Sequence, residues 1–251
     1  MTAAGLRRVS GIAGMLLLVQ AIVLWIIIAE TPARLLLPVT LGPLGGRERI
    51  VLFTVDLGAG VIALCLLVAV SRLIVVVPSV FPRYSSGVRS NRHRARWIEF
   101  AFSSSITIFL VAQLNGISDI GALVLSYATT SGMTLFSVLQ ERSPRSASGR
   151  MLPLSFAAAT GIVPWGVIAF HQVAALALSQ PPSAFARVIT LTMLAFAFGF
   201  FVSHWREQRR SDSAQSAAAG ERTHILLSLA STSVFAWLVV LGTVGVANVR
   251  L

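Results

Sequence analysis

Acidic side chains inside apolar segments are the residues of this sequence that are best placed to do chemistry. Glu99 follows Arg96 and Trp97 at the start of one apolar segment, and Asp56 lies within another. An ionisable group inside a membrane is costly, so it indicates a functional site by default. Arg96 precedes Glu99 by three residues, so the two side chains share a helix face and could pair. Glu99 is therefore either a functional acid or an interfacial anchor bonded to Arg96, and Asp56 is either a buried acid or a group near the outer surface.

Hydroxyl side chains accompany this acid in two parts of the chain. Ser103 lies one helical turn after Glu99 on the same face, and Thr107 follows one turn later. Near the C-terminus, Ser228 and Thr232 are four residues apart and therefore stack on one face of a helix. Serines and threonines in membrane helices commonly bond to their own backbone or allow close packing, so these residues alone do not establish a site.

Motifs of nucleotide-binding proteins, metalloproteases and serine hydrolases are missing from the sequence. It has no phosphate-binding loop, no dinucleotide fingerprint, no His-Glu-x-x-His and no Gly-x-Ser-x-Gly. The four histidines, His93, His171, His204 and His224, are expected at helix ends or in loops without the spacing of metal ligands. The single cysteine, Cys65, excludes an intramolecular disulfide. We therefore expect neither a metal site nor an enzyme.

The composition excludes a water-soluble domain. Of the 251 residues, 55% are hydrophobic and 12% are charged, and the mean hydropathy is +0.81. About a quarter of the residues of a soluble chain are charged. The surplus apolar surface must face a lipid bilayer, so we expect a multi-pass protein of the cell membrane.

Seven segments are long and apolar enough to cross a bilayer, which takes roughly 20 residues each. They are residues 11–30, 50–71, 97–117, 120–139, 152–178, 185–204 and 224–246. Residues 115–119 are typical of a tight turn between two spans, and residues 206–222 are expected to form a loop. The predicted fold is all-α, a single seven-helix transmembrane domain over residues 1–251.

Arginine positions predict the orientation, because cytoplasmic connections carry an excess of basic residues. Fifteen of the 20 arginines fall on the side of the N-terminus. The five on the other side are Arg34, Arg47, Arg49, Arg187 and Arg250. The N-terminus is therefore expected in the cytoplasm and the C-terminus outside. The net charge of +11 needs no nucleic acid, because arginines at helix ends meet anionic headgroups. A cytoplasmic protein partner for the connection from Arg83 to Arg96 is the alternative.

Several runs of the sequence together resemble the heliorhodopsins, seven-helix retinal proteins inserted inversely to ordinary microbial rhodopsins. The runs are Arg-Trp-Ile-Glu-Phe at 96–100, Gln-Glu-Arg at 140–142, Gly-Ile-Val-Pro-Trp at 161–165, Gly-Glu-Arg at 220–222 and Ala-Trp at 236–237. Their collinear spacing covers nearly the whole chain. The resemblance implies a rhodopsin-like bundle with the N-terminus inside, and a homodimer.

The resemblance also implies a retinal pocket with a protonated Schiff base on a lysine of the seventh helix. Glu99 stands at the counterion position, Ser228 at the serine beside the Schiff base, and Thr232 at the lysine itself. Thr232 cannot form an imine, and no lysine elsewhere can replace it, because all 20 basic residues are arginine. Two histidines of the family correspond to Gly14 and Arg72. The residues of the former pocket are Glu99, Ser103, Thr107, Thr130, Trp165, Ser228, Thr232 and Trp237, with Thr130 in place of an asparagine.

Loss of the lysine changes the electrostatics around Glu99. An anion in a low-dielectric pocket must then pair with Arg96 or another donor, or take up a proton. Three functions remain open. The first is a membrane ligand-binding or signalling protein without a covalent cofactor. The second is a photoreceptor that holds retinal non-covalently, or a heliorhodopsin whose lysine was removed by engineering. The third is a proton-conducting or transport protein.

Overall fold

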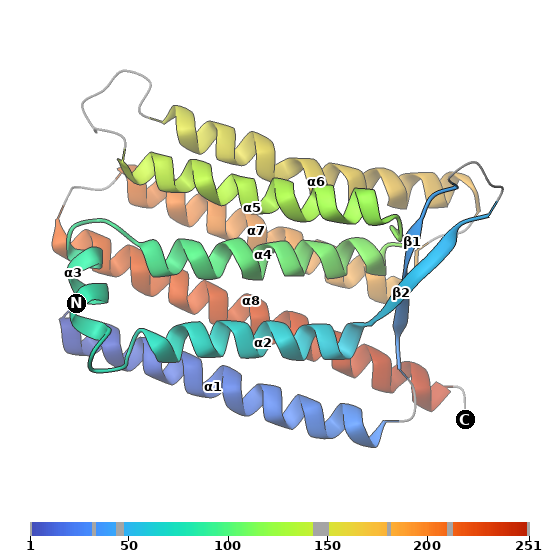
Figure 1. Ribbon diagram of the computed structural model, residues 1–251, viewed down its shortest axis with the longest axis horizontal. Helices are drawn as coiled ribbons and strands as arrows, with labels where there is room; N and C mark the ends of the chain where they lie inside the picture. Colours follow the sequence, from blue (N-terminus) through green and yellow to red (C-terminus); the bar gives the residue numbers. More distant parts are fainter. Residues whose placement is uncertain are drawn as a thin grey trace.

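The fold is a bundle of long helices, seen in a computed structural model that describes residues 2–31, 34–43, 48–142, 151–179, 182–209 and 213–249 (Figure 1). The long helices are α1 (Ala3–Glu30), α2 (Leu57–Ile74), α4 (Arg94–Leu114), α5 (Ile120–Arg142), α6 (Leu152–Ala177), α7 (Ala184–Arg209) and α8 (Ala214–Val249). All seven are long and apolar enough to cross a membrane, which confirms the predicted number of spans. Large side chains such as Trp25 and Phe170 are exposed on the outside of the bundle, where lipid would surround them.

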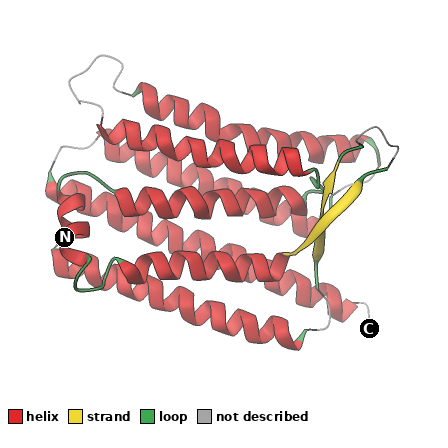
Figure 2. Ribbon diagram, in the orientation of Figure 1, coloured by secondary structure: helices red, strands yellow, loops and turns green. Residues whose placement is uncertain are grey.

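The two ends of the bundle carry different structures. A short helix, α3 (Phe81–Arg89), lies at the end where α1, α4 and α8 begin, which we call the α3 end. The strands β1 (Leu36–Leu41) and β2 (Ile50–Asp56) form an antiparallel hairpin at the opposite end, the hairpin end (Figure 2). The last turn of α8 also lies at the hairpin end, so the chain begins and finishes on opposite sides of the bundle.

The predicted second span, 50–71, was wrong at its start. Residues Ile50–Asp56 form β2, and α2 begins only at Leu57. The run of valine, leucine, phenylalanine and threonine is as apolar as a helix, but it pairs with β1. Asp56 is the N-cap of α2, since its Oδ1 accepts from the backbone N–H of Gly58 at 2.9 Å. Asp56 therefore caps a helix near the surface and is not an acid buried two turns inside a span.

Two connections expected to be loops are largely helical. Of residues 206–222, α7 takes those up to Arg209 and α8 those from Ala214 onward. The alanines at the start of α8 favour this extension, because alanine is the strongest helix former. The connection 83–96 likewise contains most of α3 and the first turn of α4. The tight turn at 115–119 is confirmed, with Gly116 at a φ of +85°.

Close packing of α1 on α2 depends on a small residue. A Cβ added at Gly14 would lie 2.9 Å from Leu73 Cγ and 3.2 Å from the carbonyl oxygen of Ala69. Glycine therefore lets the two helix backbones approach, as small residues commonly do in membrane bundles. Gly14 has a packing role at this contact.

Candidate functional site

A cavity of about 350 Å³ lies among α4, α5, α6, α7 and α8. Six of the eight residues expected in the pocket are on its wall, namely Ser103, Thr107, Thr130, Trp165, Ser228 and Thr232. Glu99 and Trp237 are not on the wall. Glu99 lies behind Ser228 and is bonded to it, whereas Trp237 packs against the apolar core of the bundle. The topology thus brings hydroxyls from α4, α5 and α8 to one internal space.

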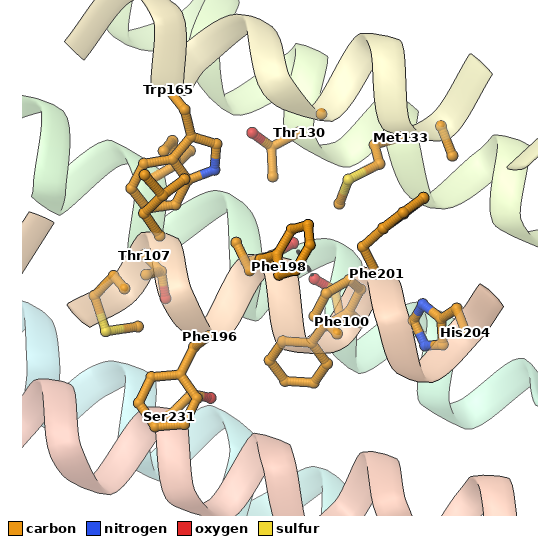
Figure 3. Close-up of a pocket in the computed structure, with 18 of the residues that line it drawn as sticks. Phe100, Thr107, Thr130, Met133, Trp165, Phe196, Phe198, Phe201, His204 and Ser231 are labelled. Carbon is orange, nitrogen blue, oxygen red and sulfur yellow. Dashed lines mark hydrogen bonds between the residues drawn. The ribbon is translucent and has the colours of Figure 1, made fainter. Parts of the chain in front are cut away.

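Most of the wall is apolar and aromatic. Figure 3 shows Trp165 at the upper left and His204 at the right of the view, with Phe100 and Met133 between them and Phe196 below Trp165. These phenylalanines and the methionine could not be predicted from the sequence, because the spacing of residues on a cavity wall does not differ from that of ordinary core residues. Small-molecule pockets are commonly of this size and lined in this way.

The cavity reaches the outer surface of the bundle between α6 and α7. Ile162 of α6 and Phe198 of α7 line it, yet 57% and 66% of their surfaces are exposed. Both side chains are apolar, and this surface would face lipid. An apolar molecule dissolved in the bilayer therefore meets no polar barrier at this opening.

Glu99 is paired with an arginine, but the arginine is Arg72 and not Arg96. Arg72 Nη2 lies 2.6 Å from Glu99 Oε2, and both side chains are buried. Ser228 Oγ donates to the other carboxylate oxygen of Glu99 at 3.2 Å. His224 Nε2 lies 3.6 Å from Glu99 Oε2. The counterion position therefore has a cation and a hydroxyl donor supplied by α2 and α8.

Arg96 is held by three other carboxylates, which is why it does not pair with Glu99. Its Nη1 and Nη2 contact the two carboxylate oxygens of Glu207 at 2.9 and 3.2 Å, a bidentate arrangement. Nη2 also lies 3.3 Å from Glu141, and Nε lies 3.4 Å from Glu221. The Arg96 side chain is only 1% exposed. The expectation that Arg96 meets lipid headgroups was therefore wrong, as it was for Arg72.

Three histidines that are distant in sequence gather around this network at the α3 end. His93 Nδ1 lies 2.6 Å from Glu141 Oε1, and the rings of His204 and His224 stack at 5.7 Å. From the sequence, these histidines were expected at separate helix ends or in loops. Their proximity follows from the alternating direction of the helices, which brings the start of α4 beside the last turns of α7 and the first turns of α8. Within the described ranges, no group of three or more His, Cys, Asp and Glu side chains is arranged to hold a metal ion.

Tyr84 joins α3 to the same network. Its hydroxyl donates to Glu221 Oε1 at 2.8 Å. Burial, followed by the negative charge of Glu221, raises the pKa of Tyr84 well above its ordinary value of about 10. Tyr84 therefore stays a neutral donor, and α3 is fixed against the start of α8.

Comparison with known proteins decides the family. Residues 6–244 match the sequence pattern that defines the heliorhodopsins. The chain belongs to the heliorhodopsin family. No curated protein matches it. A covalently bound retinal needs a primary amine to form an imine, and none of the described residues that line the cavity has one; Thr232, which the resemblance puts at the position of the lysine, has a hydroxyl.

Proposed function

We propose that this heliorhodopsin is a membrane protein without photochemistry, which binds an apolar ligand non-covalently in the cavity and transmits a signal through it. One observation carries the proposal: the Glu99 carboxylate is compensated by Arg72, 2.6 Å away, while Thr232 lines the cavity. The charge that a Schiff base would bring is already provided by a side chain outside the cavity. The space that the lysine and retinal would fill is left to a free ligand. We propose no enzymatic activity of its own.

The test compares the native protein with the Thr232→Lys variant after incubation with all-trans retinal. After borohydride reduction, mass spectrometry should find a covalent adduct on Thr232→Lys and none on the native protein. The native protein should still bind retinoids reversibly, which would quench the emission of Trp165 on the cavity wall. Absence of any retinoid binding to the native protein would overturn ligand binding in this cavity.

A photoreceptor that holds retinal non-covalently is the second candidate, because the cavity itself is intact. It would be favoured if retinal bound to the native protein acquired a shifted visible absorption band. A proton conductor is the third candidate, and the buried glutamates and histidines of the α3 end are the observation that favours it. Proton flux into liposomes that is abolished by Glu99→Gln would support this candidate.

We propose that the N-terminus faces the cytoplasm. Removing the buried Arg72 and Arg96 from the count still leaves thirteen arginines against five. Five of the counted residues, Arg47, Arg145, Arg150, Arg210 and Arg250, lie outside the described part of the chain. Labelling of single introduced cysteines with a membrane-impermeant maleimide on intact cells tests the orientation, in a Cys65→Ala variant that has no other cysteine. Glu48→Cys, at the hairpin end, should be labelled and Ser90→Cys, at the α3 end, should not.

A homodimer is proposed from the family resemblance, and native mass spectrometry in detergent tests it. The exposed arginines Arg83, Arg89, Arg92 and Arg94 near α3 are proposed to contact anionic headgroups. The alternative is a cytoplasmic protein partner that binds these arginines. It would be favoured if such a partner bound the protein in vesicles without anionic lipid and lost that binding when the charges of the four arginines were reversed.

A further inference from the structure

The hydrogen bonds of the cavity wall restrict the chemistry of a ligand. Eight hydroxyl side chains line the cavity. Five of them, Ser104, Thr107, Thr130, Ser137 and Ser231, donate their protons to backbone carbonyls of their own helices. A sixth, Ser228, donates to Glu99. A hydroxyl that has given its proton away presents only acceptor lone pairs, so these six groups call for a donor on the ligand.

Two hydroxyls of the wall have no hydrogen-bond partner among the described residues. They belong to Ser103 of α4 and Thr232 of α8, whose exposed fractions are 7% and 5%. Among the described residues, the two oxygens do not belong to the fully enclosed polar atoms without a partner, so they remain open to the cavity, where a ligand atom that bonds both would be favoured.

These two hydroxyls lie at the same level of the bundle. Ser103 is one turn after Glu99 on α4, and Thr232 is one turn after Ser228 on α8. Glu99 and Ser228 are hydrogen-bonded, and both helices begin at the α3 end. Ser103 and Thr232 therefore stand on facing helices, one turn further toward the hairpin end.

His204 supplies an independent sign of a missing partner. His204 lines the cavity (Figure 3) and is only 7% exposed, and its Nε2 has no hydrogen-bond partner among the described residues. The ring is fixed in place by Trp97, with centroids 4.8 Å apart. A fixed, buried and unsatisfied nitrogen at the edge of a cavity is a feature that a polar group of a ligand would satisfy.

The wall offers no charge to a charged ligand. Neither Asp, Glu, Lys nor Arg is among the described residues that line it. Glu99 lies behind Ser228 and is neutralised by Arg72. A carboxylate or an amine would therefore bury an uncompensated charge, which is far more costly than burying a hydroxyl.

We infer that the cavity is selective for an uncharged apolar alcohol, whose hydroxyl bonds between Ser103 and Thr232. A hydroxyl accepts from one of these groups and donates to another lone pair of the wall, whereas an aldehyde can only accept. This inference rests on the proposed function, because it specifies the ligand of the same cavity.

The experiment uses three probes with one hydrocarbon skeleton: all-trans retinol, retinal and retinoic acid. Each is titrated into the full chain in lipid nanodiscs, with quenching of Trp165 as the readout and Trp165→Phe as the control for non-specific quenching. We expect retinol to bind about tenfold more tightly than retinal, since one more hydrogen bond separates them. Retinoic acid at neutral pH should bind more weakly than either.

Variants test the assigned groups. The Ser103→Ala/Thr232→Val pair should remove the preference for retinol over retinal while retinal still binds. Ser105→Ala is the matched control, because Ser105 is a buried serine of α4 that bonds Tyr127 and does not line the cavity. It should keep the preference. Equal or tighter binding of retinal or retinoic acid would overturn the alcohol selectivity and leave the proposed function standing. Failure of all three probes would overturn the proposed function and the inference together.

Discussion

The guanidinium of Arg72 lies 2.6 Å from the carboxylate of Glu99 and joins α2 to α4 inside the bundle. The same arginine lies 3.9 Å from Glu221 of α8. Arg72 approaches Glu99 from α2. Ser228, which bonds Glu99, and Thr232 line the cavity, whereas Glu99 and Arg72 do not. The counterion position is thereby neutralised without the participation of any group on the cavity wall other than Ser228.

Arg72→Gln should destabilise the protein by about 3–5 kcal/mol, because it leaves Glu99 buried without its cation. The double variant Arg72→Gln/Glu99→Gln should recover part of this loss, since neither charge then remains alone. Unfolding by SDS or heat in detergent measures the change. Arg34→Gln is the control, because Arg34 is exposed, lies 3.6 Å from Asp56 and should contribute less than about 1 kcal/mol. Equal losses for both single variants would contradict a special role of Arg72.

An amine placed at Thr232 should compete with Arg72 for Glu99. In Thr232→Lys, one carboxylate faces two cations, so the retinal imine should remain largely unprotonated and absorb in the near ultraviolet. In Thr232→Lys/Arg72→Gln, the imine is the remaining cation near Glu99, so a visible band should appear. Absorption spectra of the two variants at neutral pH measure this difference. A visible band of equal strength in both would show that Arg72 does not compensate Glu99.

Two glycines of α6 provide a matched test of the cavity. A Cβ at Gly161 would overlap the thioether of Met133, and both residues line the cavity, whereas a Cβ at Gly166 meets nothing within 4 Å. Gly161→Ala should weaken retinol binding and cost about 1–3 kcal/mol of overpacking. Gly166→Ala should leave binding unchanged and stabilise the helix by up to about 1 kcal/mol. Retinol titration and unfolding measure both, and a loss of binding in both variants would argue against this location of the ligand.

The raised pKa of Tyr84 predicts a response to alkaline pH. In the unfolded chain a tyrosine ionises near pH 10, so the stability contributed by the Tyr84–Glu221 bond is complete below about pH 10. It is lost as the pH rises through the higher pKa of the folded state. Tyr127→Phe leaves Tyr84 as the single tyrosine of the chain. Its tyrosinate absorbance should be nearly absent at pH 10 and should appear with unfolding. Ionisation at pH 10 with the fold intact would contradict the buried bond.

Hydropathy was sufficient to predict the seven helices, because each span is an apolar run of the required length. It failed at residues 50–56, because a short apolar run next to a helix has the same high hydropathy whether it forms a strand or further turns of the helix. The pocket hydroxyls were found through the family resemblance, whereas the ion pairs were not. Arg72 and Glu99 are 27 residues apart and lie on different helices, so no local pattern joins them.

The positions of three buried glutamates along the chain already indicate that they lie at one end of the bundle. Glu141, Glu207 and Glu221 each lie within a few turns of a helix end, and the predicted topology puts those ends on one side of the bundle. Each of these glutamates has an arginine next to it in the sequence, so the sequence alone could not distinguish them from solvated groups at the membrane interface. Only the packing of α5, α7 and α8 around Arg96 separates the two cases, because burial is a property of the assembled bundle.

The sharing of Arg96 among three helices has a consequence for biogenesis. During insertion, α4 carries Arg96, and α5, α7 and α8 carry the carboxylates that later surround it. These ion pairs join different helices, so they form only as the neighbouring helices pack together, and a charged helix end stays near the headgroups until then. The last helix of the chain brings Glu221, which touches Arg96, Arg72 and Tyr84. The polar network is therefore completed only when α8 packs beside α2, α3 and α4.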